Sequence, residues 1–171
     1  EMCIRDRLWI IQSVRHEFED RYTFAELCKE AEETDYITSR IDVNNKCFLA
    51  PENMTEAIKS YCNNNDLIIP DTAGEIAAVV YKSLADSYAD TVMQIEKNLD
   101  ITYDAIYVIG GGANAGYLNQ LTADSTGKTV VAGPAEATAI GNIMAQMIAD
   151  SVFKNLKEAR ALSLIHISEP T

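Results

Sequence analysis

Three consecutive glycines, Gly110–Gly112, are the residues of this chain whose type and position best suit chemistry. They follow the apolar run Ala105–Ile109, which is typical of a strand buried on both faces. Glycine turns the backbone through positive φ and lets a ligand approach without a Cβ in the way. A helix that begins after such a turn directs unpaired N–H groups toward the same place, which suits a phosphate or a polar ring. A tight strand-to-helix turn without a ligand explains the triplet equally well.

The residues after the triplet predict a βαβ unit over residues 105–132. A helical apolar pattern over residues 117–125 ends at Gly127, and the apolar run Thr129–Ala132 is typical of a second buried strand. Such units are right-handed with parallel strands, and open parallel sheets bind ligands beyond the carboxyl ends of their strands. The glycine triplet stands at such an end.

A further helix is expected to start at Gly133–Pro134, with Pro134 near its first turn and Glu136 beside its positive end. Gly141 lies inside this helix, where close packing on a sheet would explain a glycine. The apolar stripe of the helix consists of Ala137, Ile140, Met144, Met147 and Ile148.

Helices dominate the chain before the triplet. Apolar spacing predicts a helix over residues 8–19, and capping patterns open two more at Thr23 and Asn53. Residues 34–52 show no sustained helical period and are expected to form a loop with at most short strands.

The longest predicted helix begins with a capping box at Thr72 and runs to about Leu99. Its apolar residues recur at steps of three and four, which predicts one continuous stripe along the helix. The stripe consists of Ile76, Val80, Leu84, Tyr88, Thr91 and Ile95.

Two nucleotide-binding motifs fit the chain poorly. Gly127–Thr129 resembles the end of a P-loop, but Thr122 occupies the position of its first glycine, and the lysine ends a helix instead of opening one. Gly110, Gly112 and Ala115 match the G-x-G-x-x-A pattern of dinucleotide sites. However, the next strand ends without the acid that would bind the ribose.

Composition excludes several classes of function. A net charge of -12 argues against nucleic acid or an anionic membrane as a partner, because both need a basic face. The four cysteines form no C-x-x-C pair and the two histidines, His16 and His166, lie far apart, which excludes zinc knuckles and histidine metal clusters. No apolar run is long enough to span a membrane and no signal peptide opens the chain, so a cytoplasmic location is expected.

The two ends do not fit the residues between them. Residues 1–7 read EMCIRDR, without a cap signal or an apolar face, and residues 162–171 read LSLIHISEPT after a charged helix end. Both strings resemble translated sequencing-adapter sequence. We therefore expect artefactual tails at 1–7 and 162–171, and a single domain over residues 8–160.

A longer string carries a family resemblance. Residues 106–146 read IYVIGGGANAGYLNQLTADSTGKTVVAGPAEATAIGNIMAQ, which pairs the glycine triplet with AGPAEATAIGN. This pairing resembles the C-terminal domain of FGGY-type carbohydrate kinases, and the strings LWIIQ, FLAPENM and SLADSYAD agree with it. The resemblance implies an α/β fold, namely part of a ribonuclease-H-like domain of the actin and hexokinase type. In that fold the βαβ unit at 105–132 is flanked by several helices.

The same resemblance implies the nucleotide-binding segment of an ATP-dependent kinase that phosphorylates a ketose sugar with Mg²⁺. It places Gly111 against the nucleotide, with Gly110 and Gly112 shaping the loop. The family often has an asparagine near the adenine at the position of Ala115, whereas here Asn114 stands one place earlier. The predicted nucleotide-binding residues are Gly110, Gly111, Gly112 and Asn114.

None of Asp86, Asp90, Asp100, Asp104 or Asp124 matches the motif of the family's catalytic base, and no catalytic and no metal-binding residue is assigned. Asp86, Asp90, Asp100 and Asp104, on or beside the long helix, are expected to be solvated carboxylates. Two alternatives stay open: an independent nucleotide- or dinucleotide-binding module, and a kinase of the same family with another sugar substrate. The sequence does not predict the oligomeric state.

Overall fold

The structure, a computed structural model, describes residues 8–19, 21–34, 36–134 and 136–164. The chain divides into two compact units, the first made of residues up to 106 together with 115–130, and the second of residues 107–114 together with 131 onward. The predicted tail at 1–7 lies outside the described residues, as do residues 165–171 with His166. The first residues of the other predicted tail continue a helix as far as Leu164.

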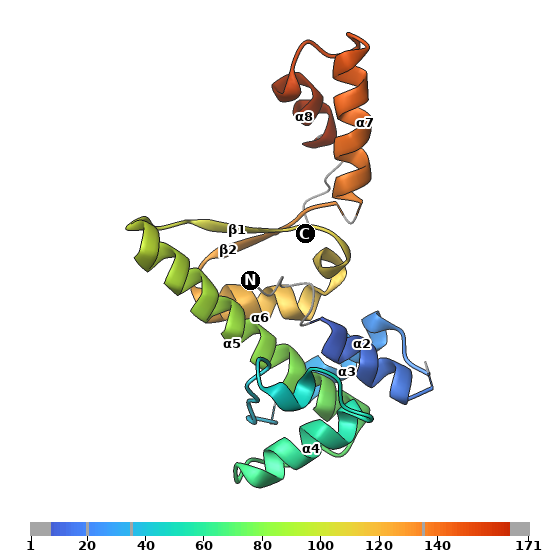
Figure 1. Cartoon of the computed structure of the whole chain (residues 1–171), viewed down its shortest axis with the longest axis vertical. Coiled ribbons are helices and arrows are strands. Elements are labelled where there is room, and N and C mark those ends of the chain that lie inside the picture. Colours follow the sequence, from blue (N-terminus) through green and yellow to red (C-terminus); the bar gives the residue numbers. More distant parts are fainter. Residues whose placement is uncertain (1–7, 20, 35, 135, 165–171) are drawn as a thin grey trace. The chain divides into compact units, whose positions relative to one another are not determined.

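The first unit is mostly helical (Figure 1). The predicted helices are confirmed with bounds shifted by a few residues, and within residues 36–52 the structure contains a 3-10 turn and no strand. The elements are α2 (Trp9–Glu17), α3 (Phe24–Glu33), η1 (Lys46–Phe48), α4 (Met54–Asn64), α5 (Ala73–Leu99) and α6 (Gly116–Thr126).

Side-chain caps begin three of these helices, as predicted. The Thr23 hydroxyl accepts a hydrogen bond from the Glu26 N–H at 3.2 Å, while the Glu26 carboxylate accepts one from the Thr23 N–H at 2.7 Å. Thr72 opens α5 with the same reciprocal arrangement, and the Asn53 side chain caps α4. Each cap satisfies N–H groups that have no partner within the helix.

The central helix α5 has two different halves. Every residue from Ile76 to Ala85 is buried, whereas none from Asp86 to Leu99 is. The predicted stripe is therefore buried in the first half and half-buried at Tyr88 and Thr91, but it is wrong at Ile95, which is 44% exposed. The reason is that α2, α3 and α6 contact α5, and a helix that is apolar all round is stable only where neighbours cover every side.

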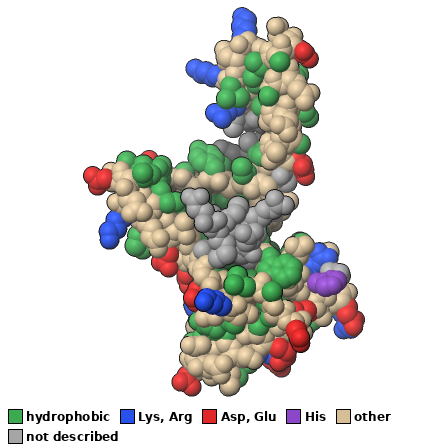
Figure 2. Space-filling view, in the orientation of Figure 1, with side chains coloured by type: hydrophobic (Ala, Val, Ile, Leu, Met, Phe, Trp, Pro, Cys, Tyr) green, Lys and Arg blue, Asp and Glu red, His purple; other side chains and the backbone are tan. Residues whose placement is uncertain are grey.

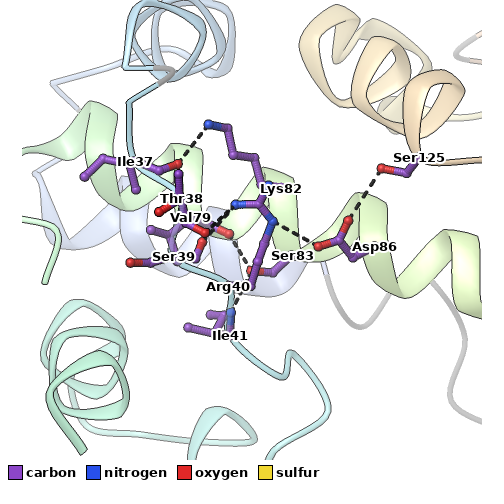
Figure 3. A network of polar contacts seen from close by, with 10 residues as sticks. All are labelled: Ile37, Thr38, Ser39, Arg40, Ile41, Val79, Lys82, Ser83, Asp86 and Ser125. Atoms are coloured by element: carbon purple, nitrogen blue, oxygen red, sulfur yellow. Dashed lines mark hydrogen bonds and ion pairs between the residues drawn. The ribbon is translucent and has the colours of Figure 1, made fainter. Parts of the chain in front are cut away.

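An extended segment, residues 37–41, is bonded to the buried half of α5 (Figure 3). The Lys82 ammonium, 5% exposed, donates a hydrogen bond to the Ile37 carbonyl at 2.9 Å. The Ser83 hydroxyl accepts the Ile41 N–H at 2.9 Å and donates to the carbonyl one turn earlier in α5. Side chains of α5 therefore form hydrogen bonds with the N–H and C=O groups of a loop that is packed against the helix, where these groups would otherwise have no partner.

Asp86 is exposed, as expected of a solvated carboxylate, and it also makes polar contacts. Its carboxylate accepts a hydrogen bond from Arg40 Nε at 2.9 Å and lies 3.5 Å from the Ser125 hydroxyl of α6 (Figure 3). Asp86 begins the half of α5 where apolar burial stops. A polar contact there joins the 37–41 segment, α5 and α6 at the rim of the core.

Two strands, β1 (Ala105–Val108) and β2 (Thr129–Ala132), form a two-stranded sheet. The Thr129 N–H donates to the Asp104 carbonyl, and the Gly133 N–H donates to the Val108 carbonyl. The residue numbers of donor and acceptor both increase from one bond to the next, as they do in a parallel pair. The parallel βαβ unit is thus confirmed, while its handedness stays a prediction.

Burial of the first strand on both faces is a wrong prediction. Tyr107 and Ile109 are 73% and 65% exposed, whereas Ile106 and Val108 are half-buried. Alternate residues of a strand point to opposite faces, so one face is covered and the other is open. A strand buried on both faces needs a layer of helices on each side, which apolar composition alone does not supply.

The second unit contains η2 (Gly111–Asn114), α7 (Ala137–Ala149) and α8 (Leu156–Leu164). The helix expected to start at Gly133–Pro134 begins later, after Glu136, because the Gly133 N–H extends the ladder between the strands. The predicted stripe of α7 is its half-buried face, but no described residue of α7 is fully buried. Beyond the nearby backbone of α7 itself, no described atom lies within 4 Å of a Cβ placed at Gly141, so packing among the described residues does not explain that glycine.

Candidate functional site

The glycine triplet forms a tight turn at the carboxyl end of β1. Gly110 has φ +83°, a left-handed conformation that favours glycine, and its carbonyl accepts the Ala113 N–H at 3.0 Å. Gly111 through Asn114 then make one 3-10 turn, so the following α-helix starts only at Gly116. Apart from the neighbouring residues in the chain, no atom of the described residues lies within 4 Å of a Cβ placed at Gly110, which leaves open space beside this backbone.

All four predicted site residues lie in this one turn. Gly110 begins it, Gly111 and Gly112 lie inside it, and Asn114 ends it with an exposed side chain. Ala113, 8% exposed, anchors the turn between them. The structure therefore brings the predicted residues together and leaves the Asn114 amide accessible.

A second glycine segment, Gly133–Pro134, follows β2 and is bonded to the residues at the end of β1. The Gly133 N–H donates to the Val108 carbonyl at 2.8 Å, and the Gly110 N–H donates to the Pro134 carbonyl at 3.4 Å. Sequence reasoning missed this segment because it placed a helix start there. The signal was a glycine directly after an apolar strand, which is the same signal that marked the triplet.

The P-loop reading, rejected from the sequence, also disagrees with the structure. Gly127, with φ +65°, adopts a left-handed conformation and ends α6. The lysine after it makes contacts that a phosphate-binding lysine would not make. The Lys128 ammonium contacts the Glu96 carboxylate at 2.7 Å and donates to the Tyr103 carbonyl at 2.8 Å. Hydrogen bonding to Lys128 lowers the pKa of Glu96, as does the Tyr103 N–H. This lysine stabilises the chain between α5 and β1.

Two aspartates at the helices make structural contacts. Asp124 accepts the side-chain amide of Gln120 at 2.9 Å, one turn apart on α6. Asp100, in a left-handed conformation, donates its backbone N–H to the Glu96 carbonyl and ends α5.

A separate pocket of about 490 Å³ lies between α2 and residues 51–54 of the first unit. Its lining includes Trp9, Ser13 and His16, and none of the predicted site residues. Within the part of the chain that the structure describes, no three His, Cys, Asp or Glu side chains are grouped so as to hold a metal ion. None of the described helices combines the length and the apolar character that crossing a membrane requires.

Known proteins resemble this chain over most of its length. Residues 6–149 match the FGGY family of carbohydrate kinases, C-terminal domain. The chain is 44% identical over 153 residues to the rhamnulokinase of Bacillus subtilis (strain 168), which is 90% of this chain and 32% of that protein. It is 45% identical over 155 residues to the rhamnulokinase of Oceanobacillus iheyensis, 91% of this chain and 33% of that protein. The rhamnulokinase of Enterococcus faecalis is 38% identical over 169 residues, 96% of this chain and 33% of that protein. The chain spans about a third of the length of the curated relatives it matches.

Proposed function

Because the chain belongs to the FGGY family of carbohydrate kinases, as part of their C-terminal domain, we propose that it forms a nucleotide-binding face of an ATP-dependent sugar kinase. The observation that carries the proposal is the family match, which includes the turns at the ends of β1 and β2. Within those turns the triplet exposes backbone without a Cβ at Gly110, as close approach of a nucleotide requires.

The reaction we propose transfers the γ-phosphoryl group of ATP to the 1-hydroxyl of L-rhamnulose, giving L-rhamnulose 1-phosphate and ADP. Support comes from relatives named rhamnulokinase, which are 38–45% identical to this chain over about 90% of it or more. The sugar itself would be bound chiefly by other parts of the longer protein. We propose that this protein acts in the cytoplasm.

In this proposal the residues of the chain bind and orient the nucleotide. Gly111 lies against it, Gly110 and Gly112 give the turn its shape, and the exposed Asn114 amide lies near the base. Phosphoryl transfer depends mainly on positioning and on neutralising charge. The general base, which takes the proton of the sugar hydroxyl, is assigned to a part of the longer protein that this chain does not include.

Magnesium would reach this site together with ATP. Mg²⁺ in kinase sites is held by one or two carboxylates and by the phosphates. Strand β1 and the glycine triplet contain no carboxylate from residue 105 to residue 115, and the described residues contain no cluster of three or more His, Cys, Asp or Glu side chains that could hold a metal ion. We therefore assign no residue of this chain to magnesium and derive no step through the ion.

We further propose that the natural segment comprises residues 8–160 and that 1–7 and 162–171 are artefactual tails. The family match, over residues 6–149, lies almost entirely within that range. Sequencing the genomic locus tests this: an uninterrupted reading frame through the EMCIRDR and LSLIHISEPT strings would contradict it.

The test of function is a coupled ADP-release assay on the full-length protein that carries this segment. We expect turnover that requires both Mg-ATP and L-rhamnulose, with other ketoses such as L-fuculose and D-xylulose giving much lower kcat/KM. Turnover with D-xylulose and not with L-rhamnulose would contradict the proposed sugar substrate but would not affect the assignment to the kinase family. Absence of any sugar-dependent ADP release would overturn the proposed function.

A further inference from the structure

Gly133 is in close contact with the strand that leads into the glycine triplet. A Cβ built on Gly133 would lie 3.1 Å from Ile109 Cγ2 and 3.3 Å from the Val108 carbonyl oxygen. Both distances are shorter than ordinary van der Waals contact, so a side chain there would displace its neighbours by a few tenths of an ångström. The φ of Gly133 is not in the left-handed region, so alanine could adopt its backbone conformation.

The atoms that would move belong to the residues just before the triplet. The Val108 carbonyl accepts the Gly133 N–H at 2.8 Å, so the contact is part of the ladder between the strands. Ile109 is joined directly to Gly110, the residue at φ +83° that starts the turn. The Gly110 N–H in turn donates to the Pro134 carbonyl at 3.4 Å, so the glycine triplet and the Gly133–Pro134 segment are bonded to each other.

We propose that Gly133 is a positioning residue for the nucleotide turn, and that its missing Cβ sets the place of Gly110–Gly112. This inference rests on the proposed function, because it assigns the turn to ATP. Gly133 itself touches no ligand in this account and acts through Val108 and Ile109. Its role differs from that of Gly111, which lies against the nucleotide.

The chain offers a matched control in Gly141. It lies in the same unit, its φ is not left-handed, and nothing lies within 4 Å of its Cβ position. Gly141→Ala therefore makes the same chemical change without a contact. It should leave ATP binding unchanged and slightly stabilise α7, because alanine favours a helix more than glycine does.

A compensating substitution is also available. Ile109→Ala removes Cγ2, the atom closest to the added Cβ, from a side chain that is 65% exposed. Alone it should change ATP affinity little. Combined with Gly133→Ala it should restore part of the lost affinity, since only the contact with the Val108 oxygen remains.

The experiment measures ATP affinity by calorimetry and steady-state kinetics in the full-length protein that carries this segment. Misplacing a catalytic or binding group by 1 Å can cost about a hundredfold, so a shift of a few tenths should weaken ATP binding by about three- to tenfold. We expect Gly133→Ala to raise the KM for ATP by that factor while the KM for the sugar and kcat change less than twofold. Hydrogen exchange of the peptide covering residues 105–115 should quicken in Gly133→Ala and not in Gly141→Ala.

Equal ATP affinity of the Gly133→Ala and Gly141→Ala variants, in a protein whose wild type binds ATP, overturns this inference and leaves the proposed function intact. A wild type that binds no ATP overturns both. If Gly133→Ala fails to fold, the double variant decides: recovery of folding and of ATP binding with Ile109→Ala supports the inference. No recovery would show that the contact with Ile109 is not the cause and would overturn it.

Discussion

Gly111 combines two properties that a nucleotide-binding residue needs. It follows a left-handed residue at the end of a strand, and it has no side chain to separate its backbone from a ligand. Two neighbouring residues shape the turn. The Gly110 carbonyl accepts a hydrogen bond from the Ala113 N–H, and the Ala113 side chain is buried. The chemistry proposed for this turn therefore depends on backbone groups and on the absence of side chains.

Gly111→Val in the full-length protein should weaken ATP binding more than it destabilises the fold. The new side chain would occupy the space where the nucleotide approaches, and we expect a loss of about tenfold or more, equivalent to about 1.4 kcal/mol. Calorimetric ATP titration and a melting curve measure the two effects. Gly141→Val, in open space on α7, is the control for the bulk of valine. Unchanged ATP affinity in a folded Gly111→Val variant would show that the triplet is only a turn.

At the level of elements, one hydroxyl of α5 supplies a buried bond to the 37–41 segment. Ser83 accepts the Ile41 N–H, and both residues are buried (Figure 3). Ser83→Ala leaves this N–H without its acceptor and should lower the free energy of unfolding by about 1–3 kcal/mol. Urea denaturation measures the change.

Ser125→Ala serves as the control for the Ser83 prediction. Its hydroxyl lies on an exposed side of α6, 3.5 Å from Asp86, and its loss should cost less than about 0.5 kcal/mol. Equal destabilisation by the two substitutions would mean that the bond between Ser83 and Ile41 contributes nothing special.

The chain between α5 and β1 is stabilised by a pH-dependent contact. Glu96 accepts hydrogen bonds from Lys128 and from the Tyr103 N–H, and these lower its pKa. Its stabilising contribution is complete above the ordinary carboxyl range, near pH ~4.3, and is lost as the pH falls from there through the lowered pKa of the folded state.

Glu96→Gln tests this contact. Below the pKa of folded Glu96 the variant and the wild type should melt at similar temperatures, whereas between pH 5 and 7, above the ordinary carboxyl pKa of ~4.3, the wild type should be more stable. Thermal melting over this range is the measurement. A constant difference between the two proteins at every pH would show that ionisation of Glu96 plays no part.

For the whole molecule, the exposed apolar surface is the feature that most affects behaviour in solution. Space filling shows hydrophobic side chains on the surface of the chain (Figure 2). In the second unit the large exposed residues are Tyr107, Ile109, Ile143, Val152 and Leu156, and in the first unit they include Met93, Ile95 and Leu99 from the second half of α5. The two-stranded sheet also leaves an unpaired edge on each strand among the described residues.

We expect the 171-residue chain on its own to self-associate. Exposed apolar patches and open strand edges promote association, and the net charge of -12 opposes it without covering the sheet. Light scattering and hydrogen exchange on the purified chain measure this. A monodisperse monomer with strongly protected amides in β1 and β2 would contradict the expectation and would favour an independent binding module.

The isolated chain should also show no sugar kinase activity. It spans about a third of the length of its curated relatives, and we have proposed that the general base lies in a part of the longer protein that this chain does not include. A coupled ADP-release assay with L-rhamnulose and Mg-ATP is the measurement, with the full-length protein as the positive control. Sugar-dependent turnover by the isolated chain would refute the assignment of the base to another part of the protein.

Local patterns predicted the features that depend on neighbours in the chain. The capping boxes at Thr23 and Thr72, the left-handed Gly127 and the turn at Gly110 each follow from residues within a few positions of one another. Hydrogen bonds within one turn and the allowed φ of glycine decide these features, so the sequence alone determines them. The family resemblance likewise rested on short strings and is confirmed by the match over residues 6–149.

Features that depend on distant residues could be decided only by the tertiary structure. The exposure of Tyr107 and Ile109, the contact of Arg40 with Asp86 and the close approach of Gly133 to Ile109 join residues whose proximity no periodicity encodes. An apolar side chain lowers the free energy of the folded state when it is buried, but the tertiary packing decides which neighbours bury it. For the same reason the sequence marked Gly110–Gly112 as a site, whereas only the structure showed that Gly133 lies against the residues that lead into it.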